Sequence, residues 1–244
     1  MRFADFKSAA STGFAIRAQS PGRDGIKQTD SFCHRLRFYC RALYTLDMST
    51  LRQHTPFPPI TGGILAGGQG RRLGGVDKGL VPWRGQPLVQ WVLTALKSQT
   101  VAQCVSANRH LSTYESLGVL VVSDQSGTGP LAGLAALLSI TKTPWLLCVP
   151  CDAPEIPSDL AQRLLISAQS ANAPAAFLQD EGQRHPTFCI VRCSLADSAR
   201  SGAEAGQGLA DWLLSCGGVP SQAPAPLNLN TPEDFARLET PNAH

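Results

Sequence analysis

The sequence predicts an α/β fold, with a single doubly wound, mainly parallel sheet and helices on both of its faces. Two observations indicate this class: apolar, strand-like runs alternate with segments of helical spacing, and several of the runs end in glycine or polar residues. Alternating strands and helices imply parallel strands joined by right-handed crossovers. Such sheets bind ligands beyond the carboxyl ends of their strands, so the residues after each run are the candidate site.

The expected elements follow from short apolar runs and from apolar spacing of the helical period. Parallel strands are expected at residues 64–66, 103–107, 119–122 and 145–149, and helices at 88–96, 112–117, 130–141, 158–171 and 208–216. A strand over 173–178, a polar turn over 179–184 and a strand over 187–191 are also expected. Residues 219–226 are interpreted as a Pro/Ala linker, followed by a short strand that carries Asn228 and Asn230 on one face. Thr231 and Pro232 have the residue types that begin a final helix.

Composition narrows the class of function. The 244 residues, of which 43% are hydrophobic, suffice for one large domain or two small ones. The sequence contains no run of eighteen apolar residues, so a membrane span is not expected. The net charge of +3 does not favour nucleic-acid binding. Residues 1–47 hold eight Lys+Arg against four Asp+Glu, whereas residues 48–244 hold thirteen against fourteen. The basic excess therefore belongs to the leader.

Residues 1–55 are expected to be an N-terminal extension, disordered or not part of the native protein, and residues 56–244 to form the folded domain. The leader lacks the continuous apolar core of a secretory signal, whereas its Arg and Ser content leaves an organelle transit peptide open. Met48 is an alternative start, and a chain beginning there is expected to be active. Without a secretory signal, a cytoplasmic location with reduced thiols is expected.

The stretch ITGGILAGGQGRRLGGVDKGL, residues 60–80, is interpreted as a phosphate-binding loop. Five glycines follow its apolar start, and three cations lie among or after them, Arg71, Arg72 and Lys78. Glycine lets the backbone approach a ligand closely, successive N–H groups form an anion site, and cations add charge. The spacing fits neither the Walker motif nor the dinucleotide motif. The loop predicts a nucleoside triphosphate site; a glycine-rich surface turn is the structural alternative.

A carboxylate follows the apolar run 145–149. Asp152 lies in the segment Pro-Cys-Asp-Ala-Pro, where the two prolines stiffen the backbone. Mg²⁺ prefers oxygen ligands, often one or two carboxylates together with substrate phosphates. Asp152 is therefore the candidate magnesium ligand. The alternative is a helix N-cap, which fits less well because the next expected helix begins near Ser158.

Other strand ends carry polar residues or glycine. Asn108 and Asp124 each follow an expected strand. The glycines of residues 127–133 open a helix and suit close packing on the sheet, contact with a ligand, or both. Eight cysteines are present, and the pairs 148/151 and 189/193 have spacings that zinc sites use. Because these cysteines lie in or beside apolar runs, buried free thiols are expected instead.

The motif L-A-G-G-x-x-x-R-L-G-G-x-D-K resembles the nucleotidyltransferases that activate small phosphorylated substrates, and within them the molybdenum cofactor guanylyltransferases. The strand-end motif of Asp152 and a later N-x-N-T-P-E motif are similar too, so the resemblance spans about residues 61–238. It implies a Rossmann-like nucleotidyltransferase fold. The implied reaction is transfer of GMP from GTP to the phosphate of molybdopterin, with Mg²⁺ as cofactor and pyrophosphate as the second product.

The resemblance also implies roles for individual residues and partners. Catalytic roles fall on Arg72, Lys78 and Asp152, with Asp152 as the metal ligand. Nucleotide or cofactor contacts are implied for Leu65, Ala66, Gly67, Gly68, Gly75, Lys78, Ser106, Asn108, Asp124 and Asp152. The implied partners are GTP and molybdopterin, with other cofactor-biosynthesis proteins or target-enzyme chaperones as further candidates, and neither nucleic acid nor membrane.

One residue departs from the family pattern, and three alternatives stay open. The family often has Asn-Ala-Asn-Arg where this chain has serine at position 106, and the shorter serine is expected to give a weaker or water-mediated base contact. The substrate could be another phosphorylated molecule, the nucleotide could be CTP, or the chain could be a non-catalytic nucleotide-binding module. His185, in a His-Pro-Thr stretch, is either a substrate contact or a structural residue.

Overall fold

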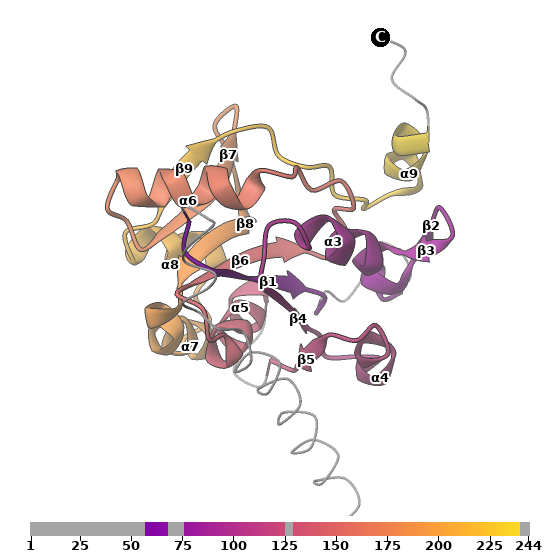
Figure 1. Ribbon diagram of the computed structural model, residues 1–244, viewed down its shortest axis with the longest axis horizontal. Coiled ribbons are helices and arrows are strands. Elements are labelled where there is room, and N and C mark those ends of the chain that lie inside the picture. The colour runs from indigo at the N-terminus through magenta and orange to yellow at the C-terminus, as the bar shows by residue number, and fades with distance from the viewer. Residues whose placement is uncertain (1–56, 68–75, 125–128, 240–244) are drawn as a thin grey trace, which may run out of the picture. The chain divides into compact units, whose positions relative to one another are not determined.

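The computed structural model describes residues 57–67, 76–124 and 129–239 (Figure 1). Three of the predicted site residues, Gly68, Arg72 and Gly75, lie outside the described residues, as does the 1–55 extension. None of the described helices is long and apolar enough to cross a membrane.

A seven-stranded sheet forms the centre of the fold, in the order β5-β4-β1-β6-β8-β7-β9. Neighbouring strands are parallel except at β8, which is antiparallel to both β6 and β7. The predicted mainly parallel sheet is therefore confirmed. The strands are β1 (Ile60–Leu65), β4 (Ala102–Ser106), β5 (Leu120–Val122), β6 (Trp145–Pro150), β7 (Ala175–Asp180), β8 (Gln183–Arg192) and β9 (Val219–Gln222).

The strand order reverses beside β1. From β1 the chain moves outward to β4 and β5, and then returns to the other side of β1 as β6. Open α/β sheets bind ligands where the order reverses, outside the carboxyl ends of the strands. We call the ends of β1, β4, β5 and β6 the carboxyl edge of the sheet.

Helices cover both faces of the sheet, as the doubly wound prediction requires. One hydrophobic cluster joins the sheet to α3 and α6, and a second joins its other face to α5, α7 and α8. The helices are α3 (Leu88–Leu96), α4 (Leu111–Glu115), α5 (Pro130–Ile140), α6 (Leu160–Ser170), α7 (Ala196–Glu204), α8 (Leu209–Ser215) and α9 (Pro232–Glu239). Two 3₁₀ turns, η2 (Lys78–Leu80) and η3 (Cys193–Leu195), and a hairpin of β2 (Pro82–Trp83) and β3 (Gln86–Pro87) complete the described elements.

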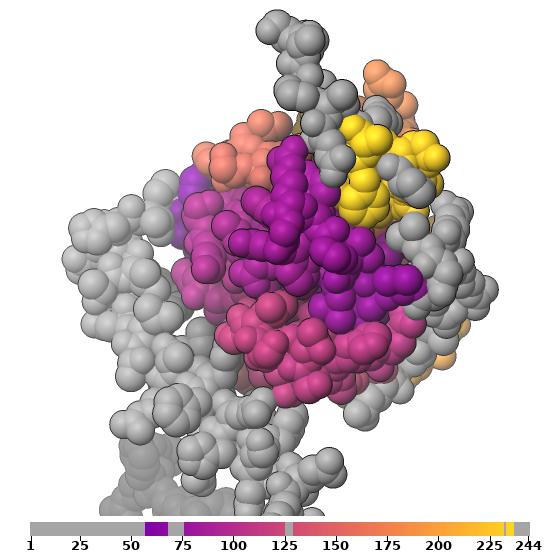
Figure 2. Space-filling model, turned by 90° about the vertical axis from the view of Figure 1, so that its right-hand side faces the viewer, coloured from indigo at the N-terminus to yellow at the C-terminus, as the bar shows by residue number. Residues whose placement is uncertain are grey.

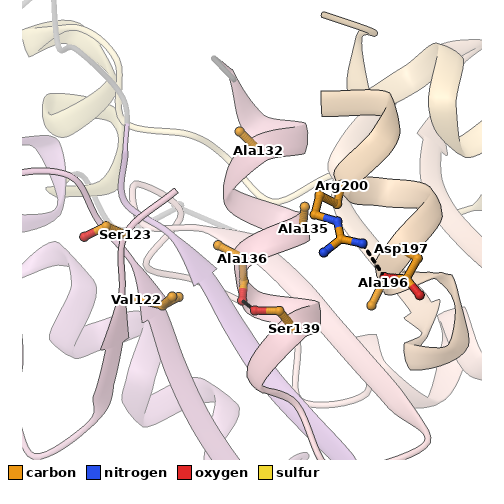
Figure 3. Close-up of a pocket in the computed structure, with 9 residues that line it drawn as sticks. All are labelled: Val122, Ser123, Ala132, Ala135, Ala136, Ser139, Ala196, Asp197 and Arg200. Atoms are coloured by element: carbon orange, nitrogen blue, oxygen red, sulfur yellow. Dashed lines mark hydrogen bonds and ion pairs between the residues drawn. The ribbon is translucent and has the colours of Figure 1, made fainter. Parts of the chain in front are cut away.

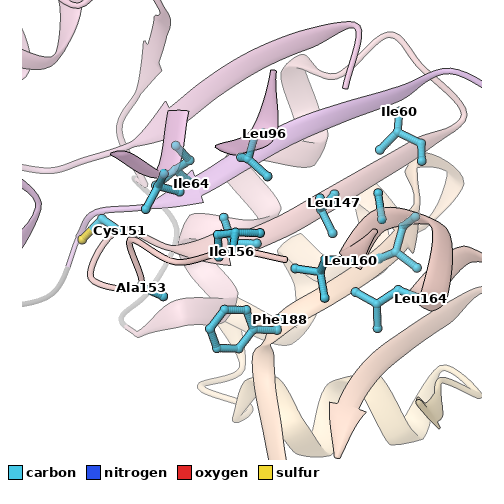
Figure 4. Close-up of a cluster of buried hydrophobic side chains, with 14 of the residues drawn as sticks. Ile60, Ile64, Leu96, Leu147, Cys151, Ala153, Ile156, Leu160, Leu164 and Phe188 are labelled. Atoms are coloured by element: carbon cyan, nitrogen blue, oxygen red, sulfur yellow. The ribbon is translucent and has the colours of Figure 1, made fainter. Parts of the chain in front are cut away.

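The core explains why β6 is central. All six of its residues are buried, as a continuous apolar run predicts for a strand with helices on both faces. Figure 4 shows one side of this core, where Leu147 of β6 lies near Leu160 and Leu164 of α6 and Ile64 of β1 lies nearer to Cys151. Burying a side chain of this size stabilises the fold by roughly 1.5–3 kcal/mol. The packing holds the ends of β1 and β6 in fixed relative positions.

The structure corrects two predictions near the C-terminus. Residues 219–222 are not a linker but form β9, which pairs with β7 at the sheet edge. An edge strand tolerates Pro220, which lacks an N–H donor. The segment of Asn228 and Asn230 is not a strand; instead the Leu229 N–H donates to the Asp152 carbonyl at 2.8 Å. The predicted cap is confirmed, because Thr231 Oγ1 accepts from the Asp234 N–H at 3.3 Å.

Candidate active site

The candidate site lies at the carboxyl edge of the sheet, and its residues come from segments far apart in the sequence. Figure 2 views the side of the molecule where α3, the β2–β3 hairpin, α4 and α9 lie in Figure 1. The segment after the glycine loop lies at its centre, beside the C-terminal segment drawn in yellow. Part of the contact between these two segments is apolar: Trp83 and Leu88 pack with Leu229, and Phe235 adds to this cluster.

Lys78 and Asp152 form an ion pair at this edge. The Lys78 Nζ lies 3.1 Å from Asp152 Oδ2 and also donates to Asn230 Oδ1. The side chains of Lys78 and Asp152 are only 18% and 11% exposed, so water screens their charges less than it would at an open surface. The structure thus brings together two predicted catalytic residues that are 74 positions apart, and adds Asn230 to them.

The donor set at Asp152 fits a magnesium ion that shares its coordination with phosphate. Among the described residues there is no group of three or more His, Cys, Asp or Glu side chains that could enclose a metal. Such a cage is unnecessary for Mg²⁺, which keeps several waters and takes one or two carboxylates plus substrate phosphates. Asp152 offers one such carboxylate beside the start of the predicted phosphate loop.

Gly67, Asn108 and Asp124 form a second part of the site, at the ends of β1, β4 and β5. A Cβ added to Gly67 would lie 3.6 Å from Asn108 Nδ2 and 3.7 Å from Asp124 Oδ2. Asn108 Oδ1 accepts from the Asp124 N–H at 3.2 Å. Burial raises the pKa of the Asp124 carboxyl, and the hydrogen bond with Asn108 opposes this rise. A partly desolvated carboxylate of this kind gains from a ligand that donates hydrogen bonds.

We call the side chains of Asn108 and Asp124 the polar wall. Ser106 and its neighbours lie deeper in the protein than this wall. The Ala66 N–H donates to the Ser106 carbonyl at 2.8 Å, and the Leu65 carbonyl accepts from the Cys151 N–H at 3.1 Å. These two hydrogen bonds continue the pairing of β1 with β4 and β6 by one residue beyond the strand ends. Ser106 is 1% exposed, and a Cβ added to Gly133 would lie 3.0 Å from its Oγ. The close-packing interpretation of Gly133 on α5 is therefore confirmed.

Sequence reasoning missed a buried hydrogen-bond network around Asp77, the residue before Lys78. Asp77 is 5% exposed, and its carboxylate accepts from the Tyr114 hydroxyl at 2.6 Å. The His110 Nδ1 lies 3.1 Å from the other oxygen. Burial, followed by smaller effects that include the bond to Asp77, raises the pKa of the Tyr114 hydroxyl, so it stays a donor. An acidic residue directly before the loop lysine was the signal that could have found the network.

The described cysteines are free thiols, and one of them, Cys151, lies beside this site. Cys148 and Cys189 are opposite each other on β6 and β8, and both are buried free thiols, as expected. Cys151 is buried next to Asp152, and burial raises the pKa of its thiol. His185 pairs with Leu178 in the β7–β8 hairpin. The two predicted roles of His185, a substrate contact or a structural residue, both stay predictions.

A separate hollow of about 460 Å³ lies between the end of β5 and helices α5 and α7. Figure 3 shows alanines of α5 on one side of it and the ion pair of Arg200 and Asp197, whose atoms lie 2.8 Å apart, on the other. None of the predicted site residues within the described ranges lines this hollow. The described candidate site is therefore the ion pair and the polar wall, not this hollow.

Comparison with known proteins gives the same family as the motifs. A family model described as the MobA-like NTP transferase domain matches residues 62–219. The molybdenum cofactor guanylyltransferase of Cupriavidus metallidurans is 45% identical over 146 residues, which cover 57% of this chain and 72% of that protein. The molybdenum cofactor guanylyltransferase of Methylibium petroleiphilum is 38% identical over 194 residues, 74% of this chain and 96% of that protein.

Solved structures share the fold. Molybdopterin-guanine dinucleotide biosynthesis protein A of Archaeoglobus fulgidus superposes with a TM-score of 0.61 at 22% identity, over 73% of this chain and 96% of that one. The 2-C-methyl-D-erythritol 4-phosphate cytidylyltransferase of Thermus thermophilus gives 0.56 at 17% identity, over 72% and 96%. A Mycobacterium tuberculosis protein in complex with manganese gives 0.55 at 16% identity, over 74% and 97%.

Proposed function

The chain belongs to the family of MobA-like NTP transferases, and we propose that it transfers GMP from GTP to the phosphate of molybdopterin, releasing pyrophosphate. One observation carries the proposal: Lys78 and Asp152 meet at the switch point of the sheet, 3.1 Å apart. A cation and a carboxylate there suit a metal-bound triphosphate. The wall of Asn108 and Asp124, at the same edge, suits a nucleoside.

The reaction needs positioning and charge neutralisation more than a strong base. The phosphate of molybdopterin is already a nucleophile; its oxygen attacks the α-phosphorus of GTP, and the bond to the pyrophosphate oxygen breaks. Negative charge then grows on the leaving pyrophosphate. Lys78, and Arg72 from the glycine loop, would offset that charge, which is the kind of preorganised electrostatic effect that lowers barriers most.

Asp152 would hold the metal, for which we propose Mg²⁺ among the divalent cations. The bound ion would supply charge neutralisation at the phosphate oxygens. Lys78 already donates to Asp152 Oδ2, so the lysine cation and the metal would share this carboxylate. Asn230 offers Lys78 a second acceptor, which would keep the ammonium at the site with a metal bound.

The remaining predicted residues would bind the nucleotide. Leu65, Ala66, Gly67, Gly68 and Gly75 would bring backbone close to the triphosphate. The Ala66 N–H is already donated within the sheet, so phosphate-binding N–H groups would begin at Gly67.

The base and ribose would meet the polar wall. Asp124, with its raised pKa, would accept hydrogen bonds from guanine or ribose, and Asn108 would orient it. Ser106 is almost fully buried, so its part in base recognition would be indirect.

The proposal also covers the segment that is needed for activity, the cellular compartment and the partner proteins. Residues 56–244 would suffice for activity, so a chain shortened to begin at Met48 should be soluble and active; an insoluble or inactive product would contradict this. Free thiols at the six described cysteines support a reducing cytoplasm as the compartment. Proteins that supply molybdopterin or receive the dinucleotide cofactor are the further partners we propose.

Pyrophosphate release tests the function. The full chain is incubated with molybdopterin, Mg²⁺ and one nucleoside triphosphate at a time, with and without the pterin. We expect release that needs the pterin and the metal and that favours GTP. Preference for CTP would support the cytidylyltransferase alternative. Tight GTP binding without release would identify a non-catalytic module.

A further inference from the structure

The buried hydrogen-bond network of Asp77 lies next to Lys78, the proposed catalytic cation. Asp77 precedes the 3₁₀ turn η2, whose first residue is Lys78, and its carbonyl accepts from the Leu80 N–H at 3.1 Å. The Asp77 side chain is bound to the 110–114 segment, whereas the Lys78 side chain reaches Asp152 and Asn230. The turn is thus held from one side and presents its cation on the other.

The Tyr114 hydroxyl fixes the turn by contact as well as by hydrogen bonding. A Cβ added to Gly79 would lie 2.4 Å from that hydroxyl oxygen and 3.3 Å from the Cβ of Cys151. Only glycine fits such a gap without movement. Tyr114 on α4, Gly79 in the turn and Cys151 at the end of β6 therefore meet at one point, next to Asp152.

The second partner, His110, is held in an unusual conformation. Its φ of 50° and ψ of 37° are left-handed, and it forms the N-cap position of α4. A residue other than glycine is strained in this region and persists there only where its surroundings determine it. The contact of Nδ1 with Asp77 is one such determinant, although the His110 side chain is 54% exposed. His110 also lies two residues after Asn108, so the network joins the Lys78 turn to the polar wall.

We propose that Asp77, held by Tyr114 and His110, is a positioning residue that sets where the Lys78 ammonium stands relative to the triphosphate. The inference rests on the proposed role of Lys78 in nucleotidyl transfer. Asp77 itself touches neither the substrate nor the metal in this proposal. It acts through the turn, so its effect exists only when Lys78 is there to be positioned.

A double-mutant cycle tests the proposal in the full chain. Asp77→Ala, Tyr114→Phe and Lys78→Ala are compared alone and combined, by kcat and KM for GTP in the pyrophosphate assay and by Tm. We expect Tyr114→Phe and Asp77→Ala to lower kcat by about 10- to 100-fold, the cost of a misplacement near 1 Å. In the Lys78→Ala background the same changes should cause no further loss in kcat. Asp197→Asn, an exposed ion-paired aspartate on α7, is the matched control and should keep kcat.

The outcomes separate this inference from the proposed function. Losses that multiply with that of Lys78→Ala, or a fall in Tm with kcat unchanged, would overturn the positioning role alone. A Lys78→Ala variant with normal kcat would overturn the proposed role of Lys78 and with it the positioning role, whereas absence of pyrophosphate release by the parent chain would overturn the proposed function itself. Tyr114→Phe removes a single hydroxyl, so it keeps the test decisive where Asp77→Ala fails to fold. Non-additive losses in kcat support the proposal.

Discussion

Replacing Lys78 by alanine removes the one cation that the described residues bring to Asp152. The Lys78 Nζ has two acceptors, Asp152 Oδ2 at 3.1 Å and Asn230 Oδ1, and its side chain is only 18% exposed. A hydrogen bond to a charged group in such a setting is worth about 1.5–3 kcal/mol. If the ammonium meets phosphate in the transition state with similar strength, kcat/KM for GTP falls by about 10- to 150-fold.

Stability changes too, because the structure shows an ion pair rather than a solvated lysine. Lys78→Ala leaves the Asp152 carboxylate, 11% exposed, without its cation, at a cost of about 1–3 kcal/mol in the metal-free protein. Mg²⁺ should restore part of that loss in Tm by binding the folded state.

The assay compares kcat/KM for GTP and Tm, each with and without Mg²⁺, for Lys78→Ala and for Lys97→Ala. Lys97 is an exposed lysine at the end of α3, so its replacement should change stability by under about 0.5 kcal/mol and leave the kinetics intact. Kinetics for Lys78→Ala within about twofold of the parent protein, under 0.5 kcal/mol, would refute the reasoning.

Three further predictions concern Asp152 as the proposed metal ligand, the packing around Gly79 and alkaline stability. Asp152→Asn conserves volume but binds Mg²⁺ poorly, so turnover should fall by about 100-fold or more while the circular dichroism spectrum is kept; near-normal magnesium-dependent turnover would remove Asp152 from the metal site. Gly79→Ala should lower stability by about 1–3 kcal/mol through overpacking against the Tyr114 hydroxyl. The loss in Tm should shrink in a Tyr114→Phe background, where the atoms nearest to the new Cβ lie 3.3 Å away. An equal loss in both backgrounds would refute the contact. Burial raises the pKa of the Cys104 thiol from about 9 to about 12. Above pH 9 this thiol therefore ionises in the unfolded protein and stays protonated in the folded protein. The contribution of Cys104 to the free energy of unfolding then falls by up to about 1.4 kcal/mol per pH unit. Tm should therefore drop less steeply between pH 8 and 10 in Cys104→Ala than in the parent protein, and parallel curves would contradict the assignment.

The parts of the fold with strong local signals were predictable. The apolar run that forms β6 has no polar residue within it, and a fully buried central strand is the structure that such a run favours. The helix α7 was not predicted, because its buried residues are only Ala199, Gly202 and Ala203. These residues give little apolar contrast, and a Cβ on Gly202 would lie 2.9 Å from Trp212, so packing across helices determines the position.

The site shows a similar division. Residue type and position after a strand were enough to select Lys78, Asp124 and Asp152, since these are local properties of the chain. Their pairing was not readable, because Lys78 meets Asn230 across 152 positions and only the folded chain brings them together. Asp77 was missed for a related reason: its importance lies in a partner, Tyr114, that the sequence does not connect to it.

The mass of the pterin product shows directly whether the chain transfers GMP to molybdopterin. The full chain is incubated with molybdopterin, Mg²⁺ and an equimolar mixture of GTP and CTP, and the products are resolved by mass spectrometry. We predict a molybdopterin species heavier by one GMP residue, formed together with an equal amount of pyrophosphate and absent with Asp152→Asn. Unmodified molybdopterin, or a product carrying CMP in place of GMP, would contradict it.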